Sequence, residues 1–184
     1  SDNGGASSNG SSNLPLAGFK GIKFEGGIRV PFVLHWKERF PQGSVYNAMI
    51  SALDILPTCV AAAGADPSSK RPLDGVNLLP FLDKTNESVP HETLFWHKLW
   101  FSAMREGPWK LIWVQDYGYA LYNLENDLSE RIDLSKTQPD RVDRMAKSLN
   151  SWKSELAKPQ WSEDIRYFKI HTDIHRRIIN GALR

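Results

Sequence analysis

Two side chains with oxygen donors, Asp2 and Asn3, stand together near the start of the chain and are followed by Gly4 and Gly5. A hard divalent cation such as calcium prefers carboxylate and amide oxygens as ligands. Small residues after the ligands let the backbone fold closely around an ion. Taken alone, these four residues are more often a polar turn without a metal, so a metal site here is a hypothesis that needs further motifs.

The elements that must position such a site belong to a chain of 184 residues, 41% of them hydrophobic. This size allows one globular domain or two small ones. The net charge is only +2, whereas nucleic-acid-binding proteins are strongly basic. Cys59 is the only cysteine, which excludes an internal disulfide framework and a cysteine-rich zinc site. No apolar run approaches the roughly 20 residues of a membrane span.

The first part of the chain shows the patterns of a strand and of helices. The nearly continuous apolar run of residues 28–36 predicts a buried strand. Residues 45–66 have apolar side chains at helical spacing, which predicts a helix that is kinked or divided at Pro57 and ends at Gly64. A short helix is expected at residues 76–82.

A change of pattern follows the polar residues near position 84. Three short apolar segments, residues 93–107, 109–118 and 119–127, are separated by turn signals and predict an antiparallel sheet of three or four strands. From Pro139 onward, apolar residues recur at steps of three or four. This spacing predicts an amphipathic helix that covers one face of the sheet. The fold of the residues after Lys158 is not predicted.

The order of several motifs resembles the C-terminal half of the type I sulfatases, which hydrolyse sulfate esters and belong to the alkaline-phosphatase-like superfamily. The resemblance extends from Ser1 to about Trp152, and its strength comes from the combination of motifs. These are SDNGG at residues 1–5, EGGIRVP at 25–31, DILPT at 54–58, MREGPWKLI at 104–112 and ALYNLENDLSE at 120–130.

The resemblance implies an α/β fold, in which residues 1–83 are the C-terminal portion of an alkaline-phosphatase-like catalytic domain. Residues 84–184 would form a small subdomain, an antiparallel sheet covered by a C-terminal amphipathic helix. In this interpretation the chain is the C-terminal part of a sulfatase, either as a cloned fragment or as one piece of a nicked or split enzyme.

Three site residues are implied by the resemblance. In the family, the aspartate–asparagine pair supplies two ligands to a divalent cation, usually calcium, and this role falls on Asp2 and Asn3. A family lysine that touches the sulfate group falls on Lys20, where an ammonium group can neutralise charge on a sulfate oxygen as the S–O bond breaks. The alternative for Lys20 is an ordinary solvated lysine. Because calcium takes about six to eight oxygens, the other ligands are expected from the upstream half of the enzyme.

Other acidic and basic residues receive structural interpretations. Glu25 and Arg29 of the EGGIRVP motif are expected to form an internal ion pair or backbone hydrogen bonds that hold the Lys20 loop, rather than to bind substrate. The glycines between them are expected to allow a tight backbone path. Asp54 is interpreted as a capping or buried hydrogen-bonding acid.

The aromatic segment contains candidate substrate-binding residues, His97 and Arg105, together with Trp96 and Trp100. Aromatic faces can stack on a sugar ring while polar groups reach hydroxyls or further sulfates. The competing interpretation is that the aromatic residues form the core of the sheet.

The covalent nucleophile of these sulfatases is a formylglycine made from the Cys or Ser of a C/S-x-P/A-x-R motif. No such motif occurs in this sequence. Cys59 is expected to be a small buried residue, with a reactive thiol as the alternative. The isolated chain is therefore expected to lack the nucleophile and to be inactive alone.

The function that the resemblance favours is a sulfuric ester hydrolase acting on a sulfated small molecule or sulfated glycan, with the upstream half of the same enzyme as partner. One alternative is a phosphodiesterase or phosphonate hydrolase of the same superfamily. Another is a non-catalytic module that binds a glycan or a protein. The family also implies a periplasmic or secreted location, or a lysosomal or secreted one in an animal. Neither a nucleic-acid partner nor a membrane span is expected.

Overall fold

The computed structural model describes residues 1–65, 72–161 and 164–183. The chain divides into two compact units: one comprises residues Ser1–Pro31 and Phe95–Arg184, and the other comprises Phe32–Leu94. Residues 1–31 therefore group with the second half of the chain. The boundary expected near residue 84 would have placed these two segments in different domains. The assignment of residues 1–83 to a catalytic domain stays a prediction.

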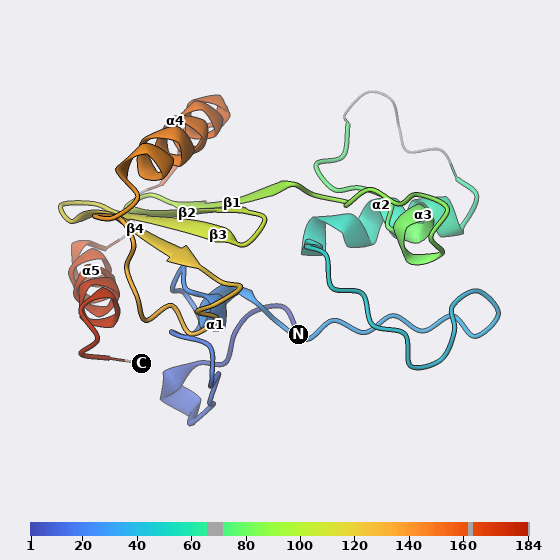
Figure 1. The fold of residues 1–184 in the computed structure, drawn as a ribbon, viewed down its shortest axis with the longest axis horizontal. Coiled ribbons are helices and arrows are strands. Elements are labelled where there is room, and N and C mark those ends of the chain that lie inside the picture. The colour runs from blue at the N-terminus through green and yellow to red at the C-terminus, as the bar shows by residue number, and fades with distance from the viewer. Residues whose placement is uncertain (66–71, 162–163, 184) are drawn as a thin grey trace. The chain divides into compact units, whose positions relative to one another are not determined.

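An antiparallel sheet forms the centre of the first unit (Figure 1). Its strands, in the order β1-β2-β3-β4, are Thr93–Lys98, Phe101–Glu106, Trp109–Val114 and Gly118–Asn123. Phe101 of β2 lies opposite Val114 of β3, and Trp109 of β3 lies opposite Asn123 of β4. The predicted sheet of three or four antiparallel strands is confirmed, with four strands.

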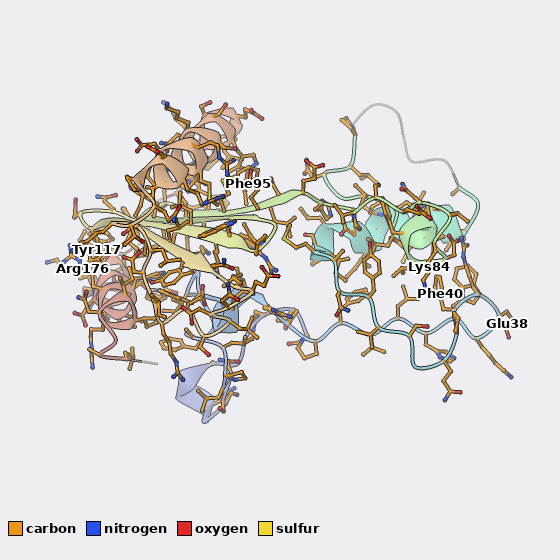
Figure 2. The ribbon with its side chains drawn as sticks, viewed as in Figure 1. Glu38, Phe40, Lys84, Phe95, Tyr117 and Arg176 are labelled. Atoms are coloured by element: carbon orange, nitrogen blue, oxygen red, sulfur yellow. The ribbon has the colours of Figure 1, made fainter. Side chains whose placement is uncertain are left out.

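Helices cover both faces of this sheet (Figure 1). Neighbouring residues of a strand point to opposite faces, so Met104 and Leu111 pack against Met145 and Leu149 of α4, Pro139–Glu155. On the same side, Phe95 of β1, labelled in Figure 2, stacks on Trp152 with ring centroids 4.9 Å apart. The amphipathic helix predicted from Pro139 onward is confirmed.

The opposite face of the sheet packs against a helix that was not predicted. This helix, α5, spans Ile165–Ile179, and its residues Ile178 and Ile179 join a core that contains Phe101 and Ile112. Because both faces of the sheet are buried, its strands are apolar along most of their length.

The first residues of the chain pack onto the same core as α5. They contain a 3-10 turn, η1, at Ser7–Asn9 and a short helix, α1, at Glu25–Ile28. Ile22 and Phe24 are buried in the core. Added Cβ atoms at Gly26 and Gly27 would lie only 2.4 Å and 2.2 Å from backbone oxygens, so the expected tight path through these glycines is confirmed.

The buried strand predicted at residues 28–36 is wrong. The helix α1 ends at Ile28, and residues 29–36 form neither strand nor helix. Phe32 and Val33 are 43% and 89% exposed. A strand needs a hydrogen-bonded neighbour, and in the described part of the chain the only sheet is β1-β2-β3-β4, which does not include this segment.

The second unit contains short helices: η2 at Ala52–Asp54, α2 at Ile55–Ala62 and α3 at Leu79–Leu82. The helix predicted from residue 45 begins only at η2, because residues 45–51 form neither helix nor strand. Pro57 lies in the first turn of α2, where proline is tolerated, instead of dividing a longer helix. The predicted stop at Gly64 is confirmed, since Gly64 has φ +65° and its N–H donates to the Ala61 carbonyl oxygen at 3.1 Å. The helix expected at residues 76–82 is shorter than predicted, and residues 66–71 lie outside the described residues.

Cys59 of α2 is exposed, so the prediction of a buried cysteine is wrong. The helix α2 instead turns the neighbouring Pro57 and Thr58 inward. None of the helices in the described ranges has the length and apolar content that crossing a bilayer requires.

Candidate functional site

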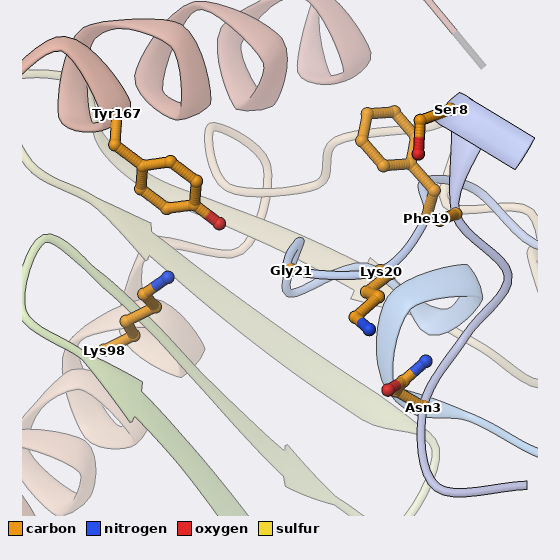
Figure 3. A pocket seen from close by; sticks show the side chains of 8 residues that line it. Asn3, Ser8, Phe19, Lys20, Gly21, Lys98 and Tyr167 are labelled. Carbon is orange, nitrogen blue, oxygen red and sulfur yellow. The ribbon is translucent and has the colours of Figure 1, made fainter.

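A pocket of about 480 Å³ lies in the first unit (Figure 3). Four segments line it: the N-terminal loop, the loop at residues 19–21, the end of β1 and the first turn of α5. The side chains in its lining include Asn3, Ser8, Phe19, Lys20, Lys98 and Tyr167. Among the described residues that line it, none has a carboxylate, whereas two have ammonium groups.

Backbone contacts hold the segment that contains Asn3 beside Lys20. The Lys20 backbone N–H donates to the Gly5 carbonyl oxygen at 3.1 Å. A Cβ atom at Gly4 would lie 1.8 Å from the Gly26 carbonyl oxygen, so only glycine fits there. Figure 3 shows the Asn3 and Lys20 side chains on the same side of the pocket. The structure thus brings together two residues that are seventeen positions apart in the sequence.

Asp2 and Asn3 offer oxygen donors of the kind that calcium prefers. Asp2 is exposed. The Asn3 amide nitrogen donates to the Gly4 carbonyl oxygen at 2.9 Å, which leaves the amide oxygen for another partner. Within the ranges that the structure describes, no three His, Cys, Asp or Glu side chains form a group that could hold a metal ion. The two donors fit calcium in kind but are only part of a coordination shell.

Asn13 positions the loops of the pocket, a role that was not predicted from the sequence. Its amide oxygen accepts from the Gly5 N–H at 2.8 Å, and its amide nitrogen donates to the carbonyl oxygens of Gly5 and Gly18 at 3.0 Å and 3.1 Å. One side chain therefore links the backbone next to Asn3 with the backbone next to Lys20. In the sequence it is one of several asparagines in a Gly- and Ser-rich stretch, so nothing distinguished it.

Glu25 lies at the centre of a buried group of charges behind the Lys20 loop. Its carboxylate is 2.9 Å from the Lys110 ammonium group, 3.5 Å from the Arg105 guanidinium and 3.7 Å from that of Arg29. Lys110 also lies 2.8 Å from Glu130, which accepts the Glu25 backbone N–H at 2.7 Å. The predicted ion pair of Glu25 and Arg29 is confirmed, although Lys110 is the nearer partner.

The two buried carboxylates have opposite pKa shifts. Burial raises the pKa of Glu130 to about 7, in spite of the attraction of Lys110. Burial also acts to raise the pKa of Glu25, but Lys110, Arg105 and Arg29 together hold it below its ordinary value. The three cations around Glu25 therefore favour its ionised form in the protein interior.

The predicted substrate residues His97 and Arg105 do not line the pocket. His97 Nδ1 lies 2.9 Å from the Ser102 hydroxyl, and its pKa is lowered by burial and by the nearby charges of Lys153 and Lys23. Arg105 is occupied by Glu25 and donates to the Gly107 carbonyl oxygen at 3.1 Å. Their substrate roles stay predictions.

Trp96 and Trp100 pack against the core on the α5 side of the sheet. Trp100 lies close to Phe168 of α5, with ring centroids 4.7 Å apart. This packing agrees with the competing interpretation, in which the aromatic residues of this segment form the core.

Two pocket residues, Lys98 and Tyr167, were not predicted. The Lys98 ammonium group lies over the Tyr167 ring, 4.3 Å from its centroid. The Tyr167 ring also contacts the His171 ring, with centroids 3.9 Å apart. The sequence signal was the spacing of aromatic and histidine residues by four in the tail, which places Tyr167, His171 and His175 on one face of a helix.

Comparisons with known proteins identify the family of the chain. The family model described as "N-sulphoglucosamine sulphohydrolase, C-terminal" matches residues 19–158. The steryl-sulfatase of Mus musculus is 33% identical over 109 residues, which cover 59% of this chain and 18% of that protein. A sulfatase of Formosa agariphila is 30% identical over 175 residues, which cover 83% of this chain and 32% of that protein.

Solved structures show the same similarity in three dimensions. A crystal structure of Ps i-CgsB in complex with k-i-k-neocarrahexaose superposes with a TM-score of 0.78 at 32% identity, covering 95% of this chain and 39% of that one. A second crystal structure of Ps i-CgsB gives the same TM-score at 31% identity, covering 99% of this chain and 41% of that one. The chain spans less than half of each of these proteins.

Proposed function

This chain belongs to the family of N-sulphoglucosamine sulphohydrolase C-terminal domains, and from that premise we propose that it is the C-terminal portion of a sulfuric ester hydrolase. The observation that best supports this function is the shared pocket of Asn3 and Lys20, in a chain whose curated relatives include sulfatases. The proposed substrates are sulfated small molecules or sulfated glycans.

Lys20 has an electrostatic role in the proposed reaction. Its ammonium group contacts a non-bridging sulfate oxygen and neutralises charge there as the S–O bond breaks. A charged group that is positioned before the substrate arrives acts most strongly in the transition state, because no reorganisation is needed. The Gly5 carbonyl oxygen, itself next to the Asn13 side chain, holds the Lys20 backbone in place.

Asp2 and Asn3 are proposed to hold calcium through their carboxylate and amide oxygens, together with ligands from the upstream half of the enzyme. When bound, calcium would supply positive charge beside the sulfate group. The formylglycine nucleophile is also proposed to come from the upstream half. The chain alone is then inactive.

The test is hydrolysis of 4-nitrophenyl sulfate by the longer polypeptide that contains this chain. Lys20→Ala is expected to lower kcat by about 10²–10³-fold, the usual cost of removing one preorganised charge-stabilising group. Asp2→Ala is expected to lower activity and to weaken its dependence on added calcium. Lys147→Ala, at an exposed position of α4, is the matched control and should leave turnover unchanged. Full turnover in both Asp2→Ala and Lys20→Ala would remove these assignments.

The other functions considered from the sequence are not favoured by the relatives found, several of which are sulfatases. A phosphodiesterase or phosphonate hydrolase would hydrolyse an aryl phosphate ester faster than the matching sulfate ester, which a rate comparison measures directly. A non-catalytic module would bind a glycan and hydrolyse neither ester. A periplasmic or secreted location, or a lysosomal one in an animal, is proposed from the family alone.

A further inference from the structure

The first turn of α5 contributes one residue, Tyr167, to the pocket that contains Lys20. The match to the family model ends at residue 158, before α5 begins. Lys20 lies inside the matched region, which starts at residue 19. The pocket thus combines a residue of the shared domain with a residue of a helix that follows that domain in the sequence.

Contacts along α5 hold this helix in place beside the Lys20 loop. Near its start, the Phe168 ring lies 4.7 Å from the Trp100 ring, measured between centroids. Further along the helix, His175 Nε2 accepts the Lys23 backbone N–H at 3.3 Å. A side chain of α5 is therefore positioned before a substrate arrives, which lowers the entropic cost of binding.

The Tyr167 hydroxyl points toward the loop that contains Lys20. Figure 3 shows this hydroxyl directed at Gly21, and a Cβ atom added at Gly21 would lie 3.4 Å from the hydroxyl oxygen. Gly21 has φ +91°, a conformation that favours glycine. The residue after Lys20 therefore places no side chain in the space beside the Tyr167 hydroxyl.

The hydroxyl is the part of Tyr167 that a substrate can use. The ring already contacts the Lys98 ammonium group, 4.3 Å from its centroid, and the His171 ring, with centroids 3.9 Å apart. In the ranges that the structure describes, the hydroxyl has no hydrogen-bond partner, and Tyr167 is 39% exposed. A phenol both donates and accepts hydrogen bonds, and so does a sugar hydroxyl, whereas a hydrocarbon aryl body does neither.

We propose that Tyr167 is a specificity residue whose hydroxyl forms a hydrogen bond with a hydroxyl of the substrate, so that the site prefers a sulfated saccharide to an aryl sulfate. The sulfate group contacts Lys20, and a sugar hydroxyl near it contacts Tyr167. A site that binds a hydroxyl discriminates against an analogue without one, because its own polar group then loses that partner. This inference rests on the proposed sulfatase function.

The test measures kcat/KM of the longer polypeptide for a sugar sulfate and for 4-nitrophenyl sulfate, which has no hydroxyl. The sugar sulfate is the fastest substrate among galactose 4-sulfate, galactose 6-sulfate and N-acetylglucosamine 6-sulfate. Tyr167→Phe removes only the hydroxyl and should lower the ratio of the two kcat/KM values, sugar to aryl, by about three- to tenfold, the effect of one hydrogen bond. Tyr117→Phe is the matched control, because Tyr117 is 38% exposed and lies outside the described lining of the pocket. It should leave the ratio unchanged.

The outcomes distinguish this inference from the proposed function. An unchanged ratio in Tyr167→Phe, or turnover of 4-nitrophenyl sulfate alone, would overturn the role of Tyr167 while the sulfatase function stands. Loss of folded protein lowers both rates equally, so misfolding does not change the ratio. If the longer polypeptide hydrolyses neither ester, the sulfatase function fails, and calorimetric binding of the same sugar sulfates decides the role of Tyr167. Weaker binding to Tyr167→Phe than to Tyr117→Phe supports that role, and equal or absent binding overturns it.

Discussion

Lys110 places a positive charge inside the first unit, where its fully buried side chain lies between the carboxylates of Glu25 and Glu130. A buried ion pair adds little stability compared with apolar residues, but loss of one partner leaves the other without compensation. The arrangement connects α1, which follows the Lys20 loop, to β3 and to the segment after β4. One residue thereby fixes the backbone that follows the site.

Replacement of Lys110 by methionine should destabilise the first unit. The buried Glu130 would then lose its cation, and Glu25 would keep only the more distant Arg105 and Arg29, so the free energy of unfolding is expected to fall by about 3–5 kcal/mol. Urea denaturation followed by tryptophan fluorescence measures the change. The exposed Lys147→Met should change the free energy by less than about 0.5 kcal/mol. If Lys110→Met lowers the free energy of unfolding by no more than this control, the buried charges of Glu25, Lys110 and Glu130 do not stabilise the fold.

At the scale of elements, α5 is connected to the site loop by His175. This side chain is buried and stacks on Phe101, with ring centroids 4.3 Å apart. With Nδ1 donating to the His171 carbonyl oxygen at 2.7 Å, Nε2 is left to accept the Lys23 backbone N–H at 3.3 Å. The neutral imidazole is therefore the form that fits, because a proton on Nε2 would point at the Lys23 N–H and remove its acceptor.

A pH dependence follows from His175. Burial, with smaller repulsion from His171, Lys23 and Lys110, lowers its pKa from 6.5 to about 4. A histidine with a lowered folded-state pKa stabilises the fold while neutral, so this stabilisation is complete above about pH 6.5 and is lost as the pH falls toward 4. His175→Gln should reduce the difference in melting temperature between pH 7.5 and pH 4.5, measured by circular dichroism. An unchanged difference would contradict the role of His175.

The elements that were predicted correctly are those whose pattern is local. Val142, Met145, Leu149 and Trp152 recur at helical spacing, and all four pack on the sheet through α4. The strand predicted at residues 28–36 failed because a strand also depends on a neighbour. The helix α5 was missed because two of its buried positions are histidines, His171 and His175, which hide the apolar period.

The candidate site was predictable only in part, because its residues come from segments that no local pattern connects. Asn3 and Lys20 were proposed from the resemblance of motifs, and the structure places them in one pocket. Lys98 and Tyr167 join that pocket through the packing of the end of β1 near the start of α5. No local pattern connects residues so far apart in the sequence.

At the scale of the whole molecule, the division into two compact units implies that a defect in one unit opens that unit first. In the unit of residues 32–94, Asp54 is fully buried and connects three segments. Its carboxylate accepts from the N–H groups of Ser51 at 2.7 Å and Val76 at 2.9 Å, and it lies 2.8 Å from His91 Nε2. The interpretation of Asp54 as a capping and buried hydrogen-bonding acid is confirmed.

Asp54→Ala should therefore open the second unit without opening the sheet. The two backbone N–H groups and His91 would lose their acceptor, which is expected to lower the local opening free energy by at least about 2 kcal/mol, or about thirtyfold in exchange rate. Hydrogen exchange with mass spectrometry should show this acceleration in peptides from α2 and α3, while peptides from β2, β3 and β4 keep their protection. Asp54→Asn retains one acceptor oxygen and should give a smaller effect. Equal acceleration in the sheet would mean that the two units unfold together and that Asp54 stabilises the whole chain.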